Sequence, residues 1–271
     1  MNLIEVDDLH VRYGDYEAVK GVSFTLGKGE ILGIVGESGS GKSTIAKTLM
    51  GLENPSSGRI QVEKRGGGGQ RRSLSLQMIF QDAVGSLNPR MTVRQTLGEV
   101  SRHARKTRTS RMDRTAADLL DLVGLSSAVL DQYPREMSGG QCQRVSIARA
   151  LACEPEILIA DEPVSALDVS VQARVLNLLR DLRNDLGLSI LLIAHDLAVV
   201  KNVCDRICVM EKGRFVDAGD AAEVFAHPTS DYTKRLLDAV PTTPRPELNL
   251  DSRTKSGVWG WKCAKRLSVK R

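Results

Sequence analysis

The segment from Gly29 to Leu52 constrains the fold more than any other part of the chain. It opens with the apolar run GEILGIVG, which predicts a short buried strand ending at a glycine-rich loop. The residues that follow, KSTIAKTLMGL, have helical character and stop at Gly51, with Pro55 just beyond. A strand, a glycine loop and a helix in this order form the opening unit of a nucleotide-binding α/β fold.

The loop between this strand and this helix matches the pattern G-x-x-x-x-G-K-[ST] in full. The candidate ATP contacts are Gly36, Glu37, Ser38, Gly39, Ser40, Gly41, Lys42, Ser43 and the next residue, Thr44. Glycines let the backbone curl until its N–H groups cradle phosphate oxygens, and the helix dipole adds positive potential. We expect Lys42 to reach the β- and γ-phosphates and the Ser43 hydroxyl to bind Mg²⁺. A purely structural glycine turn is the alternative, and the flanking strand and helix argue against it.

Two carboxylates follow a second predicted strand, ILIA, at residues 157–160. Open α/β sheets place ligands at the carboxyl ends of their strands, which is where Asp161 and Glu162 stand. Asp161 is suited to hold Mg²⁺ directly or through water, and Glu162 to orient and deprotonate an attacking water. Adjacent acids after a strand are also common in ordinary loops. The glycine-rich loop about 120 residues upstream favours the functional interpretation.

A third element, Met137-Ser138-Gly139-Gly140-Gln141, precedes a helix that we expect to begin near Cys142. A serine and two glycines at a helix N-terminus make a second phosphate-binding site. One γ-phosphate does not need two such cradles from one chain. The economical solution is a dimer, in which Ser138–Gly140 of each chain complete the phosphate loop of the other.

The pattern of elements predicts an α/β fold with a mainly parallel sheet that is covered on both faces. An antiparallel β part is expected near the N-terminus, with strands in LIEVDDLHVRY and VSFTL and with Gly14 and Asp15 as turn signals between them. A further buried strand is expected in SILLIA at 189–194. Helical periodicity dominates from about 92 to 155, which predicts a helical subdomain, about 85–155, inserted into the core. Residues 64–75 are glycine-rich and basic, which favours a mobile connection. One domain is therefore expected at 1–241, followed by a basic tail at 242–271.

The net charge of +5 is located almost entirely in that tail. Residues 242–271 hold eight Lys or Arg and two acids, so the other 241 residues sum to −1. A short basic end is more often a solvated appendage than a nucleic-acid arm, so no nucleic-acid partner is expected. Trp259 and Trp261 leave a membrane-surface or partner contact open. The chain has no apolar run long enough to span a membrane and no visible signal peptide, so we expect a cytosolic protein that reaches membranes through partners.

The order of these motifs resembles that of the ABC ATPases, over about residues 3–240. The resemblance implies further roles: Tyr13 stacks on adenine, and Gln81 touches Mg²⁺ or water and senses a transmembrane subunit. It also implies that Ser165-Ala166-Leu167-Asp168 crosses the dimer interface, and that His195 contacts the γ-phosphate and steadies Glu162. Each residue has an ordinary alternative, because Tyr13 could fill a strand, Gln81 a solvated turn and His195 a core position.

Three further segments are similar to the ATPases of oligopeptide, dipeptide and nickel importers. They are SLNPRMTV, EPVSALDVSVQARVLNLL and HDLAVVK; the segment HPTSDYTKRLLDAVP also resembles that group but has Ser and Asp inserted. The resemblance implies Mg²⁺-dependent ATP hydrolysis that powers import of peptides, related small solutes or a metal chelate. The implied partners are a second ATPase, two transmembrane permease subunits and, indirectly, an external solute-binding protein. The implied location is the cytoplasmic face of the inner membrane.

Three other classes of ABC protein are alternatives to an importer. A DNA-repair or chromosome ATPase would need a long coiled-coil or zinc insertion, and a ribosome-binding protein would usually carry two cassettes. Neither feature is visible in the sequence. A non-transport ATPase of a soluble assembly, such as a phosphonate-degrading complex, resembles the sequence more closely and stays open as the alternative.

Overall fold

Two β-sheets and a set of helices make up the computed structural model, which describes residues 1–65, 71–106 and 114–239. The smaller sheet is antiparallel and has the strand order β2-β1-β4-β5. Its strands are β1 (Asn2–Tyr13), β2 (Tyr16–Gly27), β4 (Ser57–Arg65) and β5 (Arg71–Ser73). The turn predicted at Gly14 and Asp15 joins β1 to β2, and Gly14 adopts the left-handed φ of 58° that such a turn requires.

The larger sheet has the order β10-β9-β3-β8-β7-β6 and is parallel except for β10, which is antiparallel to β9. Its strands are β3 (Ile31–Val35), β6 (Leu76–Ile79), β7 (Ile157–Asp161), β8 (Ser189–Ala194), β9 (Arg206–Glu211) and β10 (Arg214–Asp220). The predicted mainly parallel sheet and the antiparallel N-terminal part are both confirmed.

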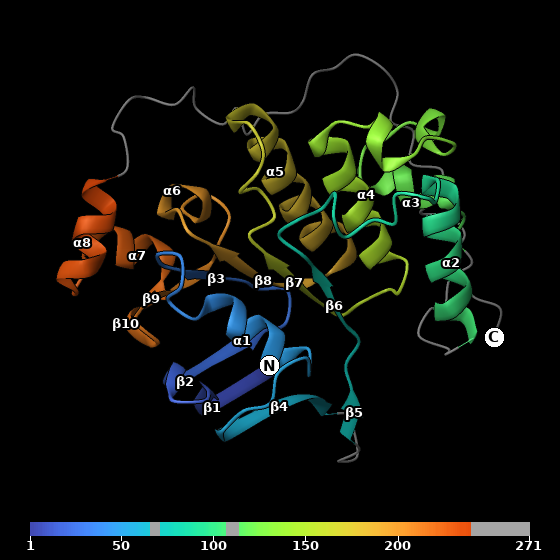
Figure 1. Ribbon diagram of the computed structural model, residues 1–271. Helices are drawn as coiled ribbons and strands as arrows, with labels where there is room; N and C mark the ends of the chain where they lie inside the picture. The colour runs from blue at the N-terminus through green and yellow to red at the C-terminus, as the bar shows by residue number, and fades with distance from the viewer. Residues whose placement is uncertain (66–70, 107–113, 240–271) are drawn as a thin grey trace. The chain divides into compact units, whose positions relative to one another are not determined.

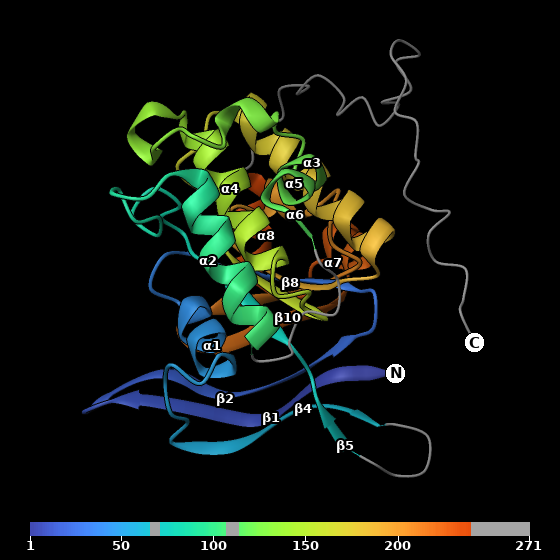
Figure 2. The same cartoon turned by 90° about the vertical axis from the view of Figure 1, so that its right-hand side faces the viewer.

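Helices lie on both faces of the larger sheet (Figures 1 and 2). Helix α1 (Lys42–Leu49) lies between the two sheets. The others are α2 (Val93–Lys106), α3 (Ala116–Leu122), α4 (Gly139–Leu151), α5 (Val169–Leu186), α6 (Leu197–Val200), α7 (Ala221–Ala226) and α8 (Asp231–Asp238), with short 3₁₀ turns at Ser127–Val129 and Pro134–Glu136. Of the described residues between 85 and 155, none forms a strand, as the periodicity predicts.

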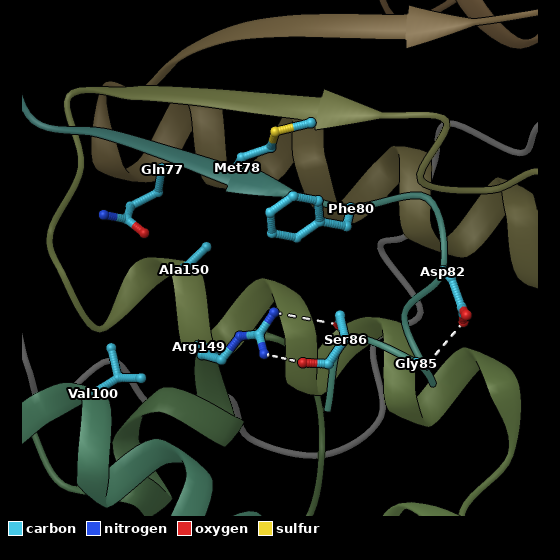
Figure 3. Close-up of a pocket in the computed structure, with 9 residues that line it drawn as sticks. All are labelled: Gln77, Met78, Phe80, Asp82, Gly85, Ser86, Val100, Arg149 and Ala150. Carbon is cyan, nitrogen blue, oxygen red and sulfur yellow. Dashed lines mark hydrogen bonds between the residues drawn. The ribbon is translucent and has the colours of Figure 1, made fainter. Parts of the chain in front are cut away.

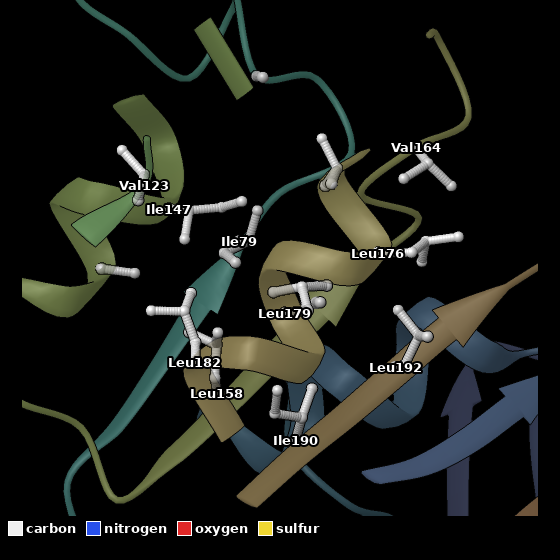
Figure 4. Packing of buried hydrophobic residues seen from close by; sticks show 14 of the residues in the cluster. Ile79, Val123, Ile147, Leu158, Val164, Leu176, Leu179, Leu182, Ile190 and Leu192 are labelled. Carbon is white, nitrogen blue, oxygen red and sulfur yellow. The ribbon is translucent and has the colours of Figure 1, made fainter. Parts of the chain in front are cut away.

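The core divides into two clusters because successive strand residues point to opposite faces of the sheet. In β7, Leu158 faces the cluster beneath α4 and α5, whereas Ile159 faces the cluster around α1. The same alternation places Leu192 and Ile193 of β8 on opposite faces. Figure 4 shows Leu176, Leu179 and Leu182 of α5 packed among side chains of β6, β7, β8 and α4. The central strands are therefore fixed from both sides, and with them the loops at their carboxyl ends.

The mobile connection expected at 64–75 is contradicted at residues 64–65 and 71–73, which lie in strands β4 and β5. Residues 71–73 form β5, which pairs with β4 and extends the antiparallel sheet. Residues 71–73 include no β-branched or aromatic residue of the kind that strands favour, but pairing with an existing strand edge satisfies the backbone groups of this segment. The four glycines at 66–69 and the basic tail at 242–271 lie outside the described residues.

Across the described ranges, the helices are all too short or too polar to cross a membrane.

Candidate functional site

The phosphate loop (Gly36–Ser43) follows β3 and is held in a narrow space that only glycine fits at two positions. A Cβ atom on Gly36 would lie 2.1 Å from the carbonyl oxygen of Met210, and one on Gly41 would lie 2.4 Å from that of Ala18. Gly41 also has a φ of 108°, which other residues rarely adopt. The glycines of the motif thus allow the loop to curl tightly against β2 and β9 before α1 begins at Lys42.

Lys42 is buried inside this loop and binds the loop's own backbone. Its Nζ donates to the carbonyl oxygens of Gly36 at 2.8 Å and Glu37 at 2.7 Å. Burial lowers the pKa of Lys42, and the negative charges of Glu162, Asp161 and Glu37 oppose that shift. The ammonium group therefore lies at the centre of the loop, where the pattern predicts a phosphate contact.

Asp161 ends β7 beside the start of α1. Its Oδ1 accepts a hydrogen bond from Ser43 Oγ at 2.9 Å, although the two residues are 118 positions apart. Burial raises the pKa of Asp161, and so does the charge of Glu162, while Ser43 and two lysines act in the opposite direction. A buried carboxylate next to a serine hydroxyl is an oxygen pair that fits Mg²⁺.

Glu162 stands in a strained backbone conformation, with a φ of 44°. Its N–H donates to the carbonyl oxygen of Ile193 in β8 at 3.0 Å, which fixes that conformation. Left-handed non-glycine residues cost on the order of 1–3 kcal/mol and gather at functional sites. Glu162 Oε2 accepts from Gln81 Nε2 at 3.0 Å and lies 3.4 Å from His195 Nδ1. The three residues predicted to act on water and the γ-phosphate thus meet at the ends of β6, β7 and β8.

Tyr13, the candidate adenine contact, ends β1 and is 44% exposed. Burial raises the pKa of its phenol. A side-chain hydrogen bond with Thr44 lowers this pKa, and one with Glu53 raises it. Thr44 is the residue that follows the phosphate loop. An exposed aromatic ring therefore lies next to α1, as the stacking role requires.

The signature segment (Ser138–Gln141) begins α4, and here the predicted helix start near Cys142 is wrong. The helix starts at Gly139, because Ser138 and Gln141 form a capping box. Gln141 N donates to Ser138 Oγ at 3.3 Å, and Ser138 N donates to Gln141 Oε1 at 2.9 Å. Within the described residues, no hydrogen bond or ion pair joins this segment to the phosphate loop.

The interface loop (Ser165–Asp168) lies between Glu162 and the signature segment. Ser165 Oγ donates to the carbonyl oxygen of Glu162 at 3.1 Å, and a Cβ atom on Gly139 would lie 3.5 Å from Leu167. Asp168 caps α5 by accepting from Val171 N at 2.9 Å, while Ala166 is exposed. The predicted residues thus form two groups, one around the phosphate loop and one around the signature segment.

Two contacts near the site were not anticipated from the sequence. Tyr232 Oη accepts a hydrogen bond from Glu37 N at 3.0 Å, and Arg149 binds Ser86 in the segment after β6. Tyr232 lies 195 residues after Glu37, so no local spacing could reveal the pair. The segment HPTSDYT, which resembled importer ATPases, was the available signal for Tyr232.

A parallel sheet with a G-x-x-x-x-G-K-S loop after β3, a buried aspartate at the end of β7 and a glutamate beside it define a P-loop nucleoside triphosphatase. The family model described as "ABC transporter" matches residues 19–165. The chain belongs to the ABC transporter family, and it is an ATP-binding and ATP-hydrolysing member of that family.

Curated relatives are similar over most of the chain. The oligopeptide transport ATP-binding protein OppF of Lactococcus lactis is 48% identical over 231 residues, which cover 83% of this chain and 72% of that protein. OppF of Salmonella typhimurium is 45% identical, with 91% of this chain and 79% of that protein covered. OppD of Mycobacterium tuberculosis is 48% identical over 84% of this chain and 38% of that protein.

Solved structures share the fold. CbiO1 of Clostridium perfringens, part of the ABC transporter complex CbiONQ, has a TM-score of 0.69 at 30% identity and covers 83% of this chain and 91% of its own. The dimeric post-hydrolysis structure of the ATP-binding cassette MJ0796, bound to ADP and Pi, has a TM-score of 0.66 at 25% identity, with 80% and 98% covered.

Proposed function

We propose that this chain is the ATP-hydrolysing subunit that powers an importer of peptides or related small solutes. The observation that carries the proposal is the contact of Gln81 with Glu162, because it joins the hydrolytic carboxylate to an exposed loop at the edge of the sheet. Relatives named for oligopeptide transport support the choice of solute. A metal chelate is a further candidate solute for such an importer.

We propose the following roles at the nucleotide, which the geometry of the site supports. The N–H groups of the phosphate loop and Lys42 bind the phosphates, while Tyr13 stacks on adenine. Ser43 and Asp161 would hold Mg²⁺, with Gln81 as a further ligand, and the bound ion would neutralise phosphate charge. Glu162 orients a water and takes its proton, and His195 steadies that carboxylate and contacts the γ-phosphate.

A second ATPase subunit completes the site in this proposal. The signature segment presents a capped helix N-terminus, and it is not bonded to the phosphate loop of its own chain. Ser138–Gly140 would bind the γ-phosphate held by the partner, with Ser165–Asp168 crossing between the two sites. The partner is a second copy or a related chain. The structure of the ATP-binding cassette MJ0796, which is dimeric and bound to ADP and Pi, supports pairing of two ATPase subunits.

Two transmembrane permease subunits are the proposed membrane partners. A cavity of about 470 Å³ opens beside the glutamine loop, which we define as residues 80–90 (Figure 3). It is lined by Gln77, Met78, Phe80, Asp82, Gly85, Ser86, Val100, Arg149 and Ala150. Phe80 is 42% exposed and Val84 is 51% exposed, so the glutamine loop presents apolar surface that a permease subunit could cover. An external binding protein would act through the permeases, and the chain would lie at the cytoplasmic face of the inner membrane.

The test is to isolate the complex from membranes through a tag on this chain. Permease subunits should co-purify, and vesicles carrying the complex and its binding protein should accumulate peptide when supplied with ATP. The Glu162→Gln complex, which should assemble but not turn over, is the matched control. Recovery of a soluble enzyme complex without permeases would instead support the phosphonate-type assembly and contradict the importer.

A further inference from the structure

Helix α8, the last helix that the structure describes, is bonded to the phosphate loop through the side chain of Tyr232. Tyr232, in the first turn of α8, is only 5% exposed, and its Oη accepts a hydrogen bond from Glu37 N at 3.0 Å. Burial raises the pKa of this phenol, so the hydroxyl stays neutral at physiological pH. The roles proposed for ATP binding and hydrolysis do not involve this contact.

The start of α8 is fixed so that Tyr232 points towards the loop. Asp217 of β10 is buried and accepts hydrogen bonds from Thr229 N at 3.3 Å and Ser230 N at 3.0 Å, and also from the Thr229 hydroxyl. Ser230 Oγ then caps the helix by accepting from Tyr232 N at 3.1 Å. Because β10 pairs with β9 and β9 with β3, α8 is held by the same sheet whose strand β3 leads into the phosphate loop.

The bond acts on the peptide group that holds Lys42. Glu37 N–H and Gly36 C=O belong to one planar trans peptide, so they point in opposite directions. Its N–H is bound outward by Tyr232, which turns its carbonyl oxygen inward, where that oxygen accepts from Lys42 Nζ at 2.8 Å. Tyr232 therefore fixes the orientation of the carbonyl that positions the lysine.

We propose that Tyr232 is a positioning residue for nucleotide binding: it locks the Gly36–Glu37 peptide, and through it Lys42, in the conformation that receives ATP phosphates. This inference rests on the proposed phosphate-binding role of the loop. Without the bond, the peptide would sample other orientations, and ATP binding would have to restore the productive one. The water-activating residues Glu162 and His195 lie on other strands, so the chemical step should be little affected.

The test compares Tyr232→Phe with wild type in the full-length chain. The substitution removes one oxygen and keeps the ring in its buried place. Because a typical hydrogen bond contributes about 0.5–1.5 kcal/mol, we expect the Kd for ATP and the KM to rise about three- to tenfold, with kcat within about twofold. The Kd would be measured by nucleotide titration in EDTA and the kinetics by phosphate release. Lys234→Gln, on the solvent side of the same helix, should change neither value.

Two results would overturn the inference. One is an unchanged Kd and KM in Tyr232→Phe. The other is a fall in kcat equal to or larger than the rise in KM, together with a lower melting temperature, which would indicate a purely structural role. Lys42→Ala separates this inference from the proposed function. If Lys42→Ala loses ATP binding while Tyr232→Phe does not, the phosphate site stands and only the role of Tyr232 fails; if Lys42→Ala still binds ATP normally, the proposed site is wrong.

Discussion

Gln81 Nε2 donates a hydrogen bond to Glu162 Oε2 across 3.0 Å, although the residues are 81 positions apart in the chain. The bond joins the end of β6 to the end of β7, two neighbouring parallel strands at one edge of the larger sheet. It gives the Glu162 carboxylate a fixed direction. A partner that moved the exposed glutamine loop would therefore also move or release the carboxylate that acts on water.

Replacing Glu162 by glutamine should separate ATP binding from hydrolysis. The amide keeps the size of the side chain and can still accept a hydrogen bond from Gln81, but it cannot take a proton from water. General-base catalysis contributes roughly 10²–10⁴-fold, so the rate of phosphate release should fall by about that factor. The Kd for ATP should stay within about twofold of wild type. Turnover near the wild-type rate would show that another group is the base.

Replacing Ser138 by alanine should affect stability and activity, whereas the matched change Thr115→Ala should affect stability alone. Both residues cap a helix within a capping box. Loss of either cap should lower the free energy of unfolding by about 1 kcal/mol, measured by chemical denaturation. Only Ser138 is proposed to touch the partner's γ-phosphate, so only its loss should reduce ATP turnover, by about tenfold or more. Equal turnover in the two variants would count against the shared site.

Arg149→Lys should weaken the connection between α4 and the glutamine loop. The guanidinium of Arg149 donates to the Ser86 carbonyl oxygen at 2.5 Å and to Ser86 Oγ at 3.2 Å (Figure 3). Lysine keeps the charge, but its ammonium group cannot donate from two nitrogens as the guanidinium does. Burial lowers the pKa of Arg149, and in such a buried place the loss of a hydrogen bond is costly. We expect a stability loss of about 1–3 kcal/mol by chemical denaturation.

The same variant should lose more of its permease-stimulated ATPase rate than of its basal rate. Ser86→Ala removes only the hydroxyl contact and is the control, with an expected loss of about 0.5–1.5 kcal/mol or less. If stimulation by permeases in reconstituted vesicles stayed at the wild-type level in Arg149→Lys, α4 would not transmit through Ser86.

His10 should make the stability of the N-terminal sheet depend on pH. A hydrogen bond from its Nδ1 to Glu17 raises the pKa of His10; burial opposes the shift, and Asp8, 3.2 Å from Nε2, adds to it. A raised pKa in the folded state means that the stabilisation is complete below the ordinary value of 6.5 and is lost as pH rises through the folded-state pKa. Glu17, whose pKa is lowered by His10 and Arg12, contributes stability that is lost as pH falls through its own folded-state pKa.

The measurement is the melting temperature of wild type and His10→Gln across that pH range. Near pH 6.5 the wild type should melt at a higher temperature than His10→Gln, and this difference in melting temperature should shrink as the solution becomes alkaline. A constant difference at all pH values would show that His10 contributes by packing and not by charge.

The sequence by itself determined the chemistry of this protein. The pattern from Gly36 to Ser43 requires a tight curl against neighbouring backbone, and only glycine provides it at positions 36 and 41. The apolar runs before Gly36 and Asp161 fixed buried strands, because segments covered on both faces cannot carry polar residues. Local patterns of this kind can be recognised in the sequence because each depends on residues only a few positions apart.

Other features were decided by pairing between distant segments. Strand β5 exists because a strand edge was available to it, although its composition predicted a loop. Helix α4 begins at Gly139 because the Gln141 side chain folds back to cap it. The bonds Gln81–Glu162 and Tyr232–Glu37 span 81 and 195 residues, and nothing in the local sequence specifies such a contact. The sequence determined which groups could act, and the tertiary structure decided which of them meet, because contacts between distant segments depend on how the whole sheet is assembled.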